Sequence, residues 1–145
     1  MNDVDLDAVY FAGFFDGEGC IAVALVDGRY HKVRISIGQT NEQVILDFQR
    51  FCGGTGTVTL KFGPTGKELY YYQLGGSTQA ANALRRLVPY MRVKREEAEL
   101  AIVLAERIAG SGYPRQQLTD EEIAERRKLA DAINSITRWK ARGIG

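Results

Sequence analysis

The stretch AVYFAGFFDGEGCIAVAL, residues 8–25, changes its character half-way along its length. The first half is apolar with small residues, as in a helix, and the second half is an apolar run typical of a strand. Between the halves stands DGEG, residues 16–19, with two acids and two glycines. Aspartate is a good N-cap, and glycine readily ends a helix. We therefore predict a helix from residue 5 or 7 to about residue 16, a glycine stop and then a strand.

Length and composition bound the class of protein. The 145 residues favour a single compact domain, and a hydrophobic content of 45% supports a true core. The sequence has no run of about 18 apolar residues that would predict a membrane span. Its acidic start, MNDVDLD, lacks the basic segment of a signal peptide. We expect an intracellular protein, cytoplasmic, organellar or phage-encoded, and not a secreted one.

Cysteine and histidine are scarce: the chain has Cys20, Cys52 and the single histidine His31. Both cysteines lie in apolar surroundings, which favours small core residues in a reducing compartment over a disulfide framework. With one histidine, a zinc site of the His/Cys type is not expected.

Charge is separated along the chain. The net charge of +1 carries no nucleic-acid signal, and the first 26 residues hold five acids and no base. Basic residues cluster in GRYHKVR, RRLVPYMRVKR and RWKARG. Such blocks cancel in the total while leaving a local basic surface.

The rest of the chain alternates between hairpins and helices. Strands are expected at 20–26, 30–39, 55–62 and 67–74, with turns at DGR and GPTG. Helices are expected at 41–53, at 77–91 with Ser77 or Thr78 as its cap, at 95–110, and at 119–139 with Thr119 and Glu122 forming a capping box. A loop is expected to join the last two helices. This order predicts an α+β fold in which the helices cover one face of a sheet and leave the other face wet.

The wet face of that sheet is polar and basic. In YHKVRISIGQ, Val33, Ile35 and Ile37 share one face, because successive strand residues point to opposite sides. The polar face then carries Tyr30, Lys32, Arg34 and Ser36, joined from the second hairpin by Thr57, Thr59, Lys61, Tyr71 and Gln73. These groups can reach phosphates and base edges. The other interpretation is a merely solvated face, which is usual for antiparallel sheets.

The segment FAGFFDGEG, residues 11–19, resembles the signature of the LAGLIDADG homing endonucleases. Three further segments are similar to that family: IGQTNEQVILDFQRFCGGTGTV, LVPYMRVKREEAEL and LTDEEIAERRKLADAINSITRW. The resemblance covers most of the chain. It implies one endonuclease domain over residues 1–145, with an αββαββα half-saddle and the next helix in residues 1–110 and a loop and helical tail in residues 111–145.

The same resemblance implies metal-dependent hydrolysis of DNA. Glu18, with Gly17, corresponds to the family's metal site, and Mg²⁺ is the implied ion, although Mn²⁺ or Ca²⁺ can occupy such a site. Gln39 corresponds to the residue that orients water near the scissile phosphate. Lys94 corresponds to the basic residue that stabilises developing charge. Asp16 is expected to serve structure at the helix end.

A homodimer is implied as well. Single-motif members of the family pair two chains, and this sequence has no second copy of the motif. Glycine within a helix costs about 0.5–1 kcal/mol relative to alanine, so Gly13 needs a compensating reason, and close approach of two helices supplies one. The implied interface consists of Ala12, Gly13, Asp16 and Gly17.

DNA would then lie on the wet face. The implied DNA-binding residues are those of the polar face together with Ala22 and Ala24 of the first strand. The implied target is long and near-palindromic, cut in both strands to leave 3′ overhangs, and tied to intron or intein mobility. One basic residue that many members carry falls here on Gln43, for which Arg34, Arg92 or Arg95 could substitute. A different class also stays open, since some relatives of this fold bind DNA without cutting it or act as intron RNA maturases.

Overall fold

The computed structural model describes residues 4–110 and 118–141, and its element order is the predicted one. The elements are α1 (Leu6–Glu18), β1 (Gly19–Val26), β2 (Tyr30–Gln39), α2 (Glu42–Phe51), β3 (Thr57–Phe62), β4 (Glu68–Leu74), α3 (Ser77–Leu87), the 3₁₀ turn η1 (Val88–Tyr90), α4 (Arg95–Gly110) and α5 (Asp120–Ala141). The α+β class and the αββαββα order with a following helical tail are confirmed. The predicted loop over residues 111–117 lies outside the described residues.

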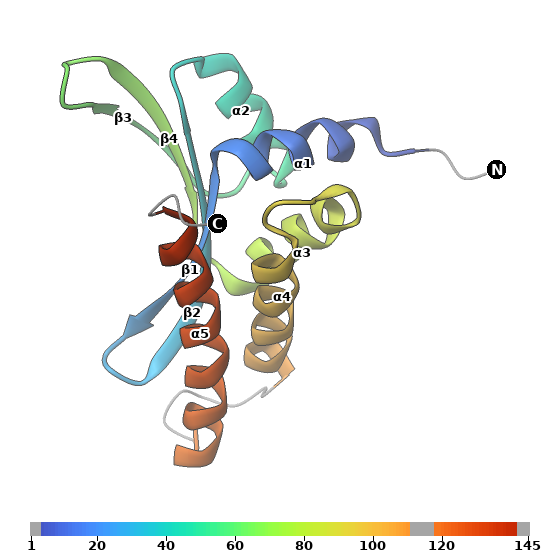
Figure 1. Cartoon of the computed structure of the whole chain (residues 1–145), viewed down its shortest axis with the longest axis vertical. Helices are drawn as coiled ribbons and strands as arrows, with labels where there is room; N and C mark the ends of the chain where they lie inside the picture. The colour runs from blue at the N-terminus through green and yellow to red at the C-terminus, as the bar shows by residue number, and fades with distance from the viewer. Residues whose placement is uncertain (1–3, 111–117, 142–145) are drawn as a thin grey trace.

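The four strands form one antiparallel sheet in the order β1-β2-β4-β3. Helices α1, α3 and α4 stack on one side of it (Figure 1). In the first hairpin, Asp27 and Gly28 both have positive φ, of 54° and 70°, which suits the turn that joins two twisted strands. Val33, Ile35 and Ile37 are buried, so the predicted inner face of β2 is confirmed.

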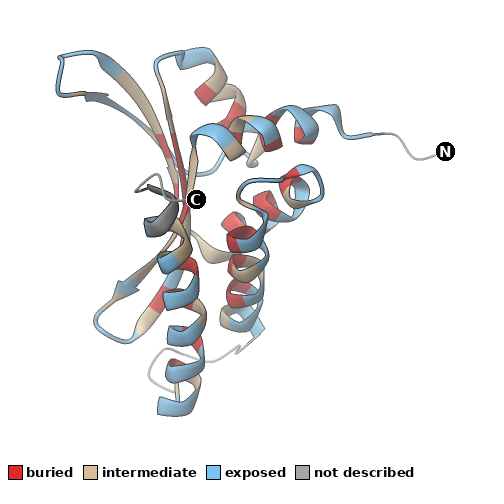
Figure 2. Cartoon of the chain, viewed as in Figure 1, coloured by how far each residue is buried: buried red, intermediate tan, exposed pale blue. Residues whose placement is uncertain are grey.

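An aromatic cluster anchors α1 and α2 to the sheet. The ring of Phe48 lies 5.3 Å from that of Phe11, 6.1 Å from that of Phe15 and 5.5 Å from that of Tyr72, measured between centroids. Phe15, Phe48 and Tyr72 have no exposed surface. Figure 2 shows that the buried segments of the helices lie on the sides that face the sheet. Burial of such large rings strongly favours the folded state.

Helix α1 is longer than the sequence predicts. It runs to Glu18, and Gly19 ends it with φ −84° and ψ 164°, which is extended backbone and not the left-handed conformation. Glycine is required here for another reason: a Cβ on Gly19 would overlap the Phe15 ring. The glycine stop therefore reflects close packing where the helix passes directly into β1.

Two predicted caps differ from the observed ones. Helix α3 has Gly76 as its N-cap and no side-chain cap, so the expected Ser77 or Thr78 cap was wrong. The Ser77 hydroxyl instead accepts from the Val33 backbone N–H at 3.0 Å and joins α3 to the sheet. The Ser77 hydroxyl therefore serves the sheet and makes no capping bond to its own helix.

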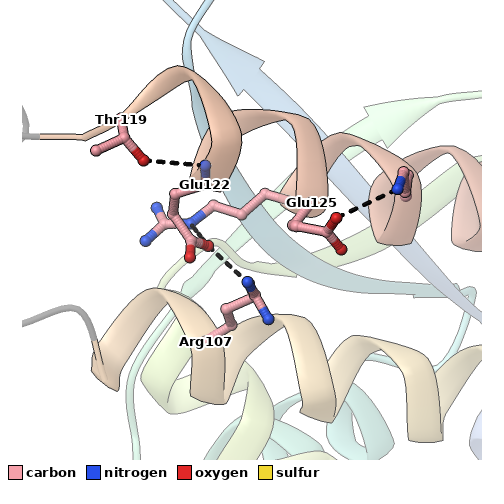
Figure 3. Close-up of polar contacts among 6 residues, drawn as sticks. Arg107, Thr119, Glu122 and Glu125 are labelled. Atoms are coloured by element: carbon pink, nitrogen blue, oxygen red, sulfur yellow. Dashed lines mark hydrogen bonds and ion pairs between the residues drawn. The ribbon is translucent and has the colours of Figure 1, made fainter.

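The predicted Thr119 cap of α5 is present. Its hydroxyl accepts from the Glu122 N–H at 3.1 Å (Figure 3). The Glu122 carboxylate is engaged by Arg107 of α4 at 2.7 Å and by Arg126 at 3.1 Å. The Thr119 half of the predicted capping box is therefore present. The Glu122 carboxylate pairs with arginines and so ties α5 to α4.

Helix α5 covers the free edge of β1. Asn134 accepts from the Val23 N–H at 3.0 Å and donates to the Val23 carbonyl at 3.2 Å. The Thr137 hydroxyl donates to the Ile21 carbonyl at 2.8 Å. Edge strands expose unpaired backbone groups, and side chains of α5 satisfy them here. The tail helix is thus part of the scaffold of the sheet.

Both cysteines are free and half-buried. Burial raises the pKa of the Cys52 thiol to about 11, so it is an unreactive packing group. Across residues 4–110 and 118–141 there is no helix with the length and apolarity needed to cross a bilayer.

Candidate active site and nucleic-acid surface

The two sides of α1 differ sharply in exposure. Phe11, Ala12 and Phe15 are buried against the core, while Gly13 and Gly17 are exposed. A Cβ added at Gly13 or at Gly17 would meet nothing within 4 Å. The chain itself therefore gives no steric reason for glycine at either position. Ala12, expected in the dimer interface, has no exposed surface and faces the interior of its own chain instead.

Exposed apolar side chains continue this glycine face toward the start of α1. Leu6 is 75% exposed, Val9 41% and Tyr10 60%. We call the set Leu6, Val9, Tyr10, Gly13 and Gly17 the open face of α1. Large apolar groups gathered on one exposed helix face mark an interaction surface more often than scattered ones do.

Asp16 fastens the end of α1 to the segment before α4. Its carboxylate accepts from the backbone N–H of Arg92 at 2.8 Å and from that of Lys94 at 3.0 Å. The Lys94 ammonium in turn donates to the Asp16 carbonyl at 2.6 Å. A helix leaves its last carbonyls without partners and carries partial negative charge there, so a lysine is well placed. Asp16 is a structural residue in this arrangement, as its position at the helix end implied.

Glu18 is the last residue of α1 and is exposed. The described residues contain no group of three or more His, Cys, Asp or Glu side chains arranged to hold a metal ion. Glu18 stands on the surface beside the open face of α1, and Lys94 is bonded to Asp16, two residues before it in the chain.

Gln39 ends β2 next to the same helix end. Gly19, the first residue of β1, pairs with Ile37, so Gln39 lies two residues farther along, beside the last turn of α1. Its side-chain oxygen accepts from the Thr40 N–H at 2.7 Å and from the Thr40 hydroxyl at 3.0 Å. The fold thus brings Glu18 of α1, Gln39 of β2 and Lys94 of the segment before α4 toward one end of α1.

The three arginines considered as substitutes for Gln43 differ in their partners. Arg95 is paired with Glu99 at 2.9 Å, one turn along α4. Arg34 is held by Gln73 on the sheet, as described below. Within the described part of the chain, no partner is found for the Arg92 guanidinium, although its backbone is fixed by Asp16. Arg92 is therefore the one of the three that remains available beside the helix end.

Strand pairing assembles the predicted polar residues on one outer surface. Arg34 lies opposite Ala22, and Lys32 lies opposite Ala24. Ser36 pairs with Gln73, and Gln73 pairs in turn with Thr57. Across all four strands the outer face contains Ala22, Ala24, Tyr30, Lys32, Arg34, Ser36, Thr57, Thr59, Lys61, Tyr71 and Gln73. We call this set the outer face.

Contacts within the sheet hold two of the three cationic side chains of the outer face, Arg34 and Lys61. With the Gln73 amide oriented to satisfy both groups, its oxygen accepts from Arg34 Nε at 3.0 Å and from Nη1 at 3.1 Å. The Lys61 ammonium sits 4.0 Å above the centre of the Tyr71 ring. Both cations are thereby oriented before any ligand arrives, which lowers the entropy lost on binding.

Not every outer-face residue is accessible. Ser36 is only 8% exposed, because it lies between strands and hydrogen bonds with Cys20, its partner on β1. Burial raises the pKa of that Cys20 thiol, although the Lys94 charge and the Ser36 bond act against the rise. Ser36 is thus poorly placed to reach a large ligand, whereas Thr57, Thr59 and Lys61 on β3 are fully on the surface.

Comparison with known proteins gives related nucleases, although no protein-family profile matches the chain. The DNA endonuclease I-CvuI of Chlorella vulgaris is 26% identical over 147 residues, spanning 96% of this chain and 84% of that protein. A structure of the same endonuclease with its target in the presence of Ca gives a TM-score of 0.72 and covers 91% of this chain and 82% of that one.

Two more distant structures share the fold. The archaeal intron-encoded homing endonuclease I-Vdi141I, solved with DNA, is 20% identical with a TM-score of 0.73, over 92% of this chain and 86% of that one. The LAGLIDADG meganuclease I-AabMI, bound to uncleaved DNA, is 20% identical with a TM-score of 0.66, over 86% of this chain and 44% of that one. By its FAGFFDGEG motif, its αββαββα fold and its similarity to I-CvuI, the chain resembles the LAGLIDADG homing endonucleases.

Proposed function

We propose that two copies of this chain form a site-specific homing endonuclease that makes a double-strand break in a long, near-palindromic DNA target and leaves short 3′ overhangs. The observation that carries the proposal is the exposed Glu18 at the end of α1, directly after the open face of the same helix. I-CvuI, its relative, has been crystallised with target DNA in the presence of Mg or Ca.

The open face of α1 is the proposed dimer interface. Gly13 and Gly17 leave room for a second helix to approach closely, since nothing of their own chain lies where a Cβ would be. A twofold pair presents the same surface on both partners, so α1 would pack against α1. Such packing would bring the two Glu18 carboxylates together. Asp16, the fourth residue assigned to this interface, would border it while holding Arg92 and Lys94 in its own chain.

The proposed metal is Mg²⁺, with Mn²⁺ or Ca²⁺ able to take the same place. The residues fit such a hard cation, because Glu18 offers carboxylate oxygens and Gly17 a carbonyl in the last helical turn. When bound, the cation activates a water and stabilises the leaving oxygen of the phosphodiester. Two converging helix ends also favour a positive ion between them.

Other residues of the chain would act around that position. Gln39 would orient a water molecule through its amide, and its location beside the last turn of α1 supports that role. Lys94 would face the charge that develops on the phosphate, since its ammonium keeps two donors beyond its bond to the Asp16 carbonyl. Arg92 would supply the peripheral positive charge that Gln43 cannot.

The outer face is the proposed DNA surface. Two such faces side by side would form one saddle, and a symmetric dimer would then meet a near-symmetric site. Arg34 and Lys32 lie on adjacent positions of this face and can each pair with guanine in the major groove. Support comes from Gln73, which already orients the Arg34 guanidinium. Ala22 and Ala24 would contribute apolar contacts such as those to thymine methyl groups.

Residues 1–145 are proposed to act as one endonuclease domain, because α5 pairs with the edge of β1 through Asn134 and Thr137. The associated biology would be intron or intein mobility within the cell. In that setting the enzyme meets a single long site in a large excess of other DNA, so specificity is carried by contacts spread along both half-sites.

Glu18→Gln tests the catalytic proposal. Purified protein is incubated with a random plasmid library, once with Mg²⁺ and once with EDTA, and the cleaved sites are selected. We expect wild type to cut only with Mg²⁺, and Glu18→Gln to bind the selected site but not to cut it. Glu121→Gln makes the same charge change on the exposed surface of α5 and serves as the control. Binding without cutting by wild type under every metal condition would identify a regulator instead of a nuclease.

Gly13→Leu tests the dimer. Because nothing lies within 4 Å of a Cβ at Gly13, the substitution is compatible with the folded protomer. We expect wild type to scatter light as a dimer at micromolar concentration and Gly13→Leu as a monomer. Ala132→Leu adds the same side chain at an exposed position of α5 and should remain dimeric. A monomeric wild type would overturn the paired arrangement.

A further inference from the structure

A pocket of about 280 Å³ lies on the helix side of the sheet, away from the end of α1. It is lined by the first residues of β2, by the N-terminus of α3 and by the early turns of α5. The lining includes Lys32, Arg126 and His31 and no carboxylate. A pocket whose two charged lining side chains, Lys32 and Arg126, are both cationic favours an anion.

Two residues that line this pocket each have a buried polar atom without a partner among the described residues. Arg126 is 3% exposed, and while its Nε donates to Glu122, its Nη2 is buried without an acceptor. His31 is 7% exposed, and its Nδ1 is also buried without a partner. Buried polar atoms are nearly always hydrogen bonded, so two unsatisfied atoms on residues that line one pocket point to a ligand.

The N-terminus of α3 adds backbone donors at the same place. This helix spans 11 residues, and its N-cap Gly76 makes no side-chain hydrogen bond. Ala80 is the first residue whose N–H bonds within the helix, to the Gly76 carbonyl at 2.8 Å. The N–H groups of Ser77, Thr78 and Gln79, all of which line the pocket, have no acceptor in the helix. They are the positive end of the helix dipole.

The acid beside the pocket does not cancel its charge. Glu122, the partner of Arg126, also accepts from Arg107 at 2.7 Å, so one carboxylate serves two guanidinium groups (Figure 3). Burial lowers the pKa of His31, with Arg127 and Arg126 adding to the effect and Asp131 opposing it. A neutral imidazole offers one N–H and one lone pair. Hydrogen phosphate has both acceptor oxygens and a hydroxyl and can satisfy either nitrogen.

We propose that this pocket is a binding site for a phosphate group, held by Arg126, His31 and the free backbone N–H groups of α3. The site goes beyond the proposed nuclease centre, which lies at the other end of the first strand. The phosphate is either free, as inorganic phosphate or on a nucleotide, or is a phosphodiester of bound DNA. Lys32 belongs both to the outer face and to the pocket lining, so its ammonium can contact a DNA phosphodiester or a free phosphate.

Because His31 is the only histidine, its imidazole carbon-bound protons give isolated NMR signals. Full-length protein in a phosphate-free, metal-free buffer is titrated with inorganic phosphate, and with sodium chloride at matched ionic strength. We expect a saturable shift of the His31 signals with phosphate and none with chloride. Equal shifts with both salts would mean general ionic screening and overturn the site.

Matched variants separate the pocket from general charge effects. Thr78→Glu places a carboxylate in the exposed first turn of α3, where helix stability favours acids, and should weaken phosphate binding by more than about tenfold. Asn82→Glu makes the same change one turn farther along and should bind like wild type. Arg126→Gln should lose binding, with exposed Arg127→Gln as its control. Unchanged affinity in Thr78→Glu would refute the proposal even if Arg126→Gln fails to fold.

A final arm identifies the source of the phosphate. A short DNA duplex is added to the protein without metal, and the His31 signals are followed. If the pocket takes a DNA phosphodiester, the duplex itself shifts them and Thr78→Glu weakens duplex binding. If it takes free phosphate, the DNA-bound protein still responds to phosphate. A His31 signal that responds to neither ligand overturns the site and leaves the nuclease proposal untouched.

Discussion

Replacing Asp16 by asparagine tests how the end of α1 is coupled to Lys94. The carboxylate accepts two backbone N–H groups, at 2.8 Å from Arg92 and at 3.0 Å from Lys94. Asparagine keeps one acceptor oxygen and turns an NH₂ group toward the other N–H, so one bond is lost and two donors face each other. A hydrogen bond to a charged group contributes about 1.5–3 kcal/mol, and the remaining neutral bond is about half as strong.

The lost bond and the weakened bond together set the expected loss of unfolding free energy. Because the Arg92 bond is solvent-exposed, we expect a loss in the lower half of that range, about 2–3 kcal/mol. Urea unfolding at fixed protein concentration measures it. Asp7→Asn is the matched control: the same exchange in the first turn of the same helix should cost only about 0.3–1 kcal/mol through the helix dipole.

The same variant should slow cleavage. With the segment that carries Lys94 released, its ammonium is no longer fixed against the helix end, and we expect single-turnover cleavage to fall by about tenfold or more. DNA binding, measured without metal, should stay close to that of wild type. An Asp16→Asn protein as stable as the Asp7→Asn control would refute the reasoning, since the two bonds would then carry no energy.

Three further changes test other parts of the structure. Asn134→Ala leaves both backbone groups of Val23 unpaired on the edge of β1 and should lower the free energy of unfolding in urea by about 2–3 kcal/mol. A loss below about 0.5 kcal/mol would mean that water replaces the amide. Gly19→Ala drives a methyl group into the Phe15 ring and should cost at least about 1–3 kcal/mol; a melting temperature equal to wild type would contradict the contact. Burial lowers the pKa of His31 below 6.5, so the unfolded chain takes up a proton before the folded one does, and stability should fall as pH drops below about 6.5. In phosphate-free buffer, the stability of His31→Gln should fall less below pH 6.5 than that of wild type. An unchanged slope of stability against pH would show that other groups produce the fall.

Strand alternation and the motif together predict most of the fold. A period of two assigns Val33 and Ile35 to the core and Arg34 to the outer face without further information, because a strand has only two sides. The order of the helices and strands follows from their patterns and turns along the chain, and the motif agrees with it. Helix α1 is harder to interpret from its sequence, since it is apolar on nearly every side. Periodicity therefore cannot tell that Ala12 faces inward and Gly13 outward.

Contacts distant in the sequence could not be predicted from pattern. Asp16 and Lys94 are 78 positions apart, and only the assembled fold shows that the acid holds the backbone before α4. The Ser77 hydroxyl was expected to cap its own helix, but Val33 lies close enough to donate to it. His31 and Arg126 carry no local signal either, because their pocket exists only where three elements meet.

The clamp between α5 and β1 has a consequence for the order of folding. Val23 and Asn134 are 111 positions apart, so the edge of β1 stays open until a segment far downstream has been made and has docked. Contacts of such long separation form slowly, and an unpaired strand edge invites association with other chains in the meantime. During synthesis this protein therefore passes through a stage in which its first hairpin is exposed to misassembly, and the arrival of α5 ends it.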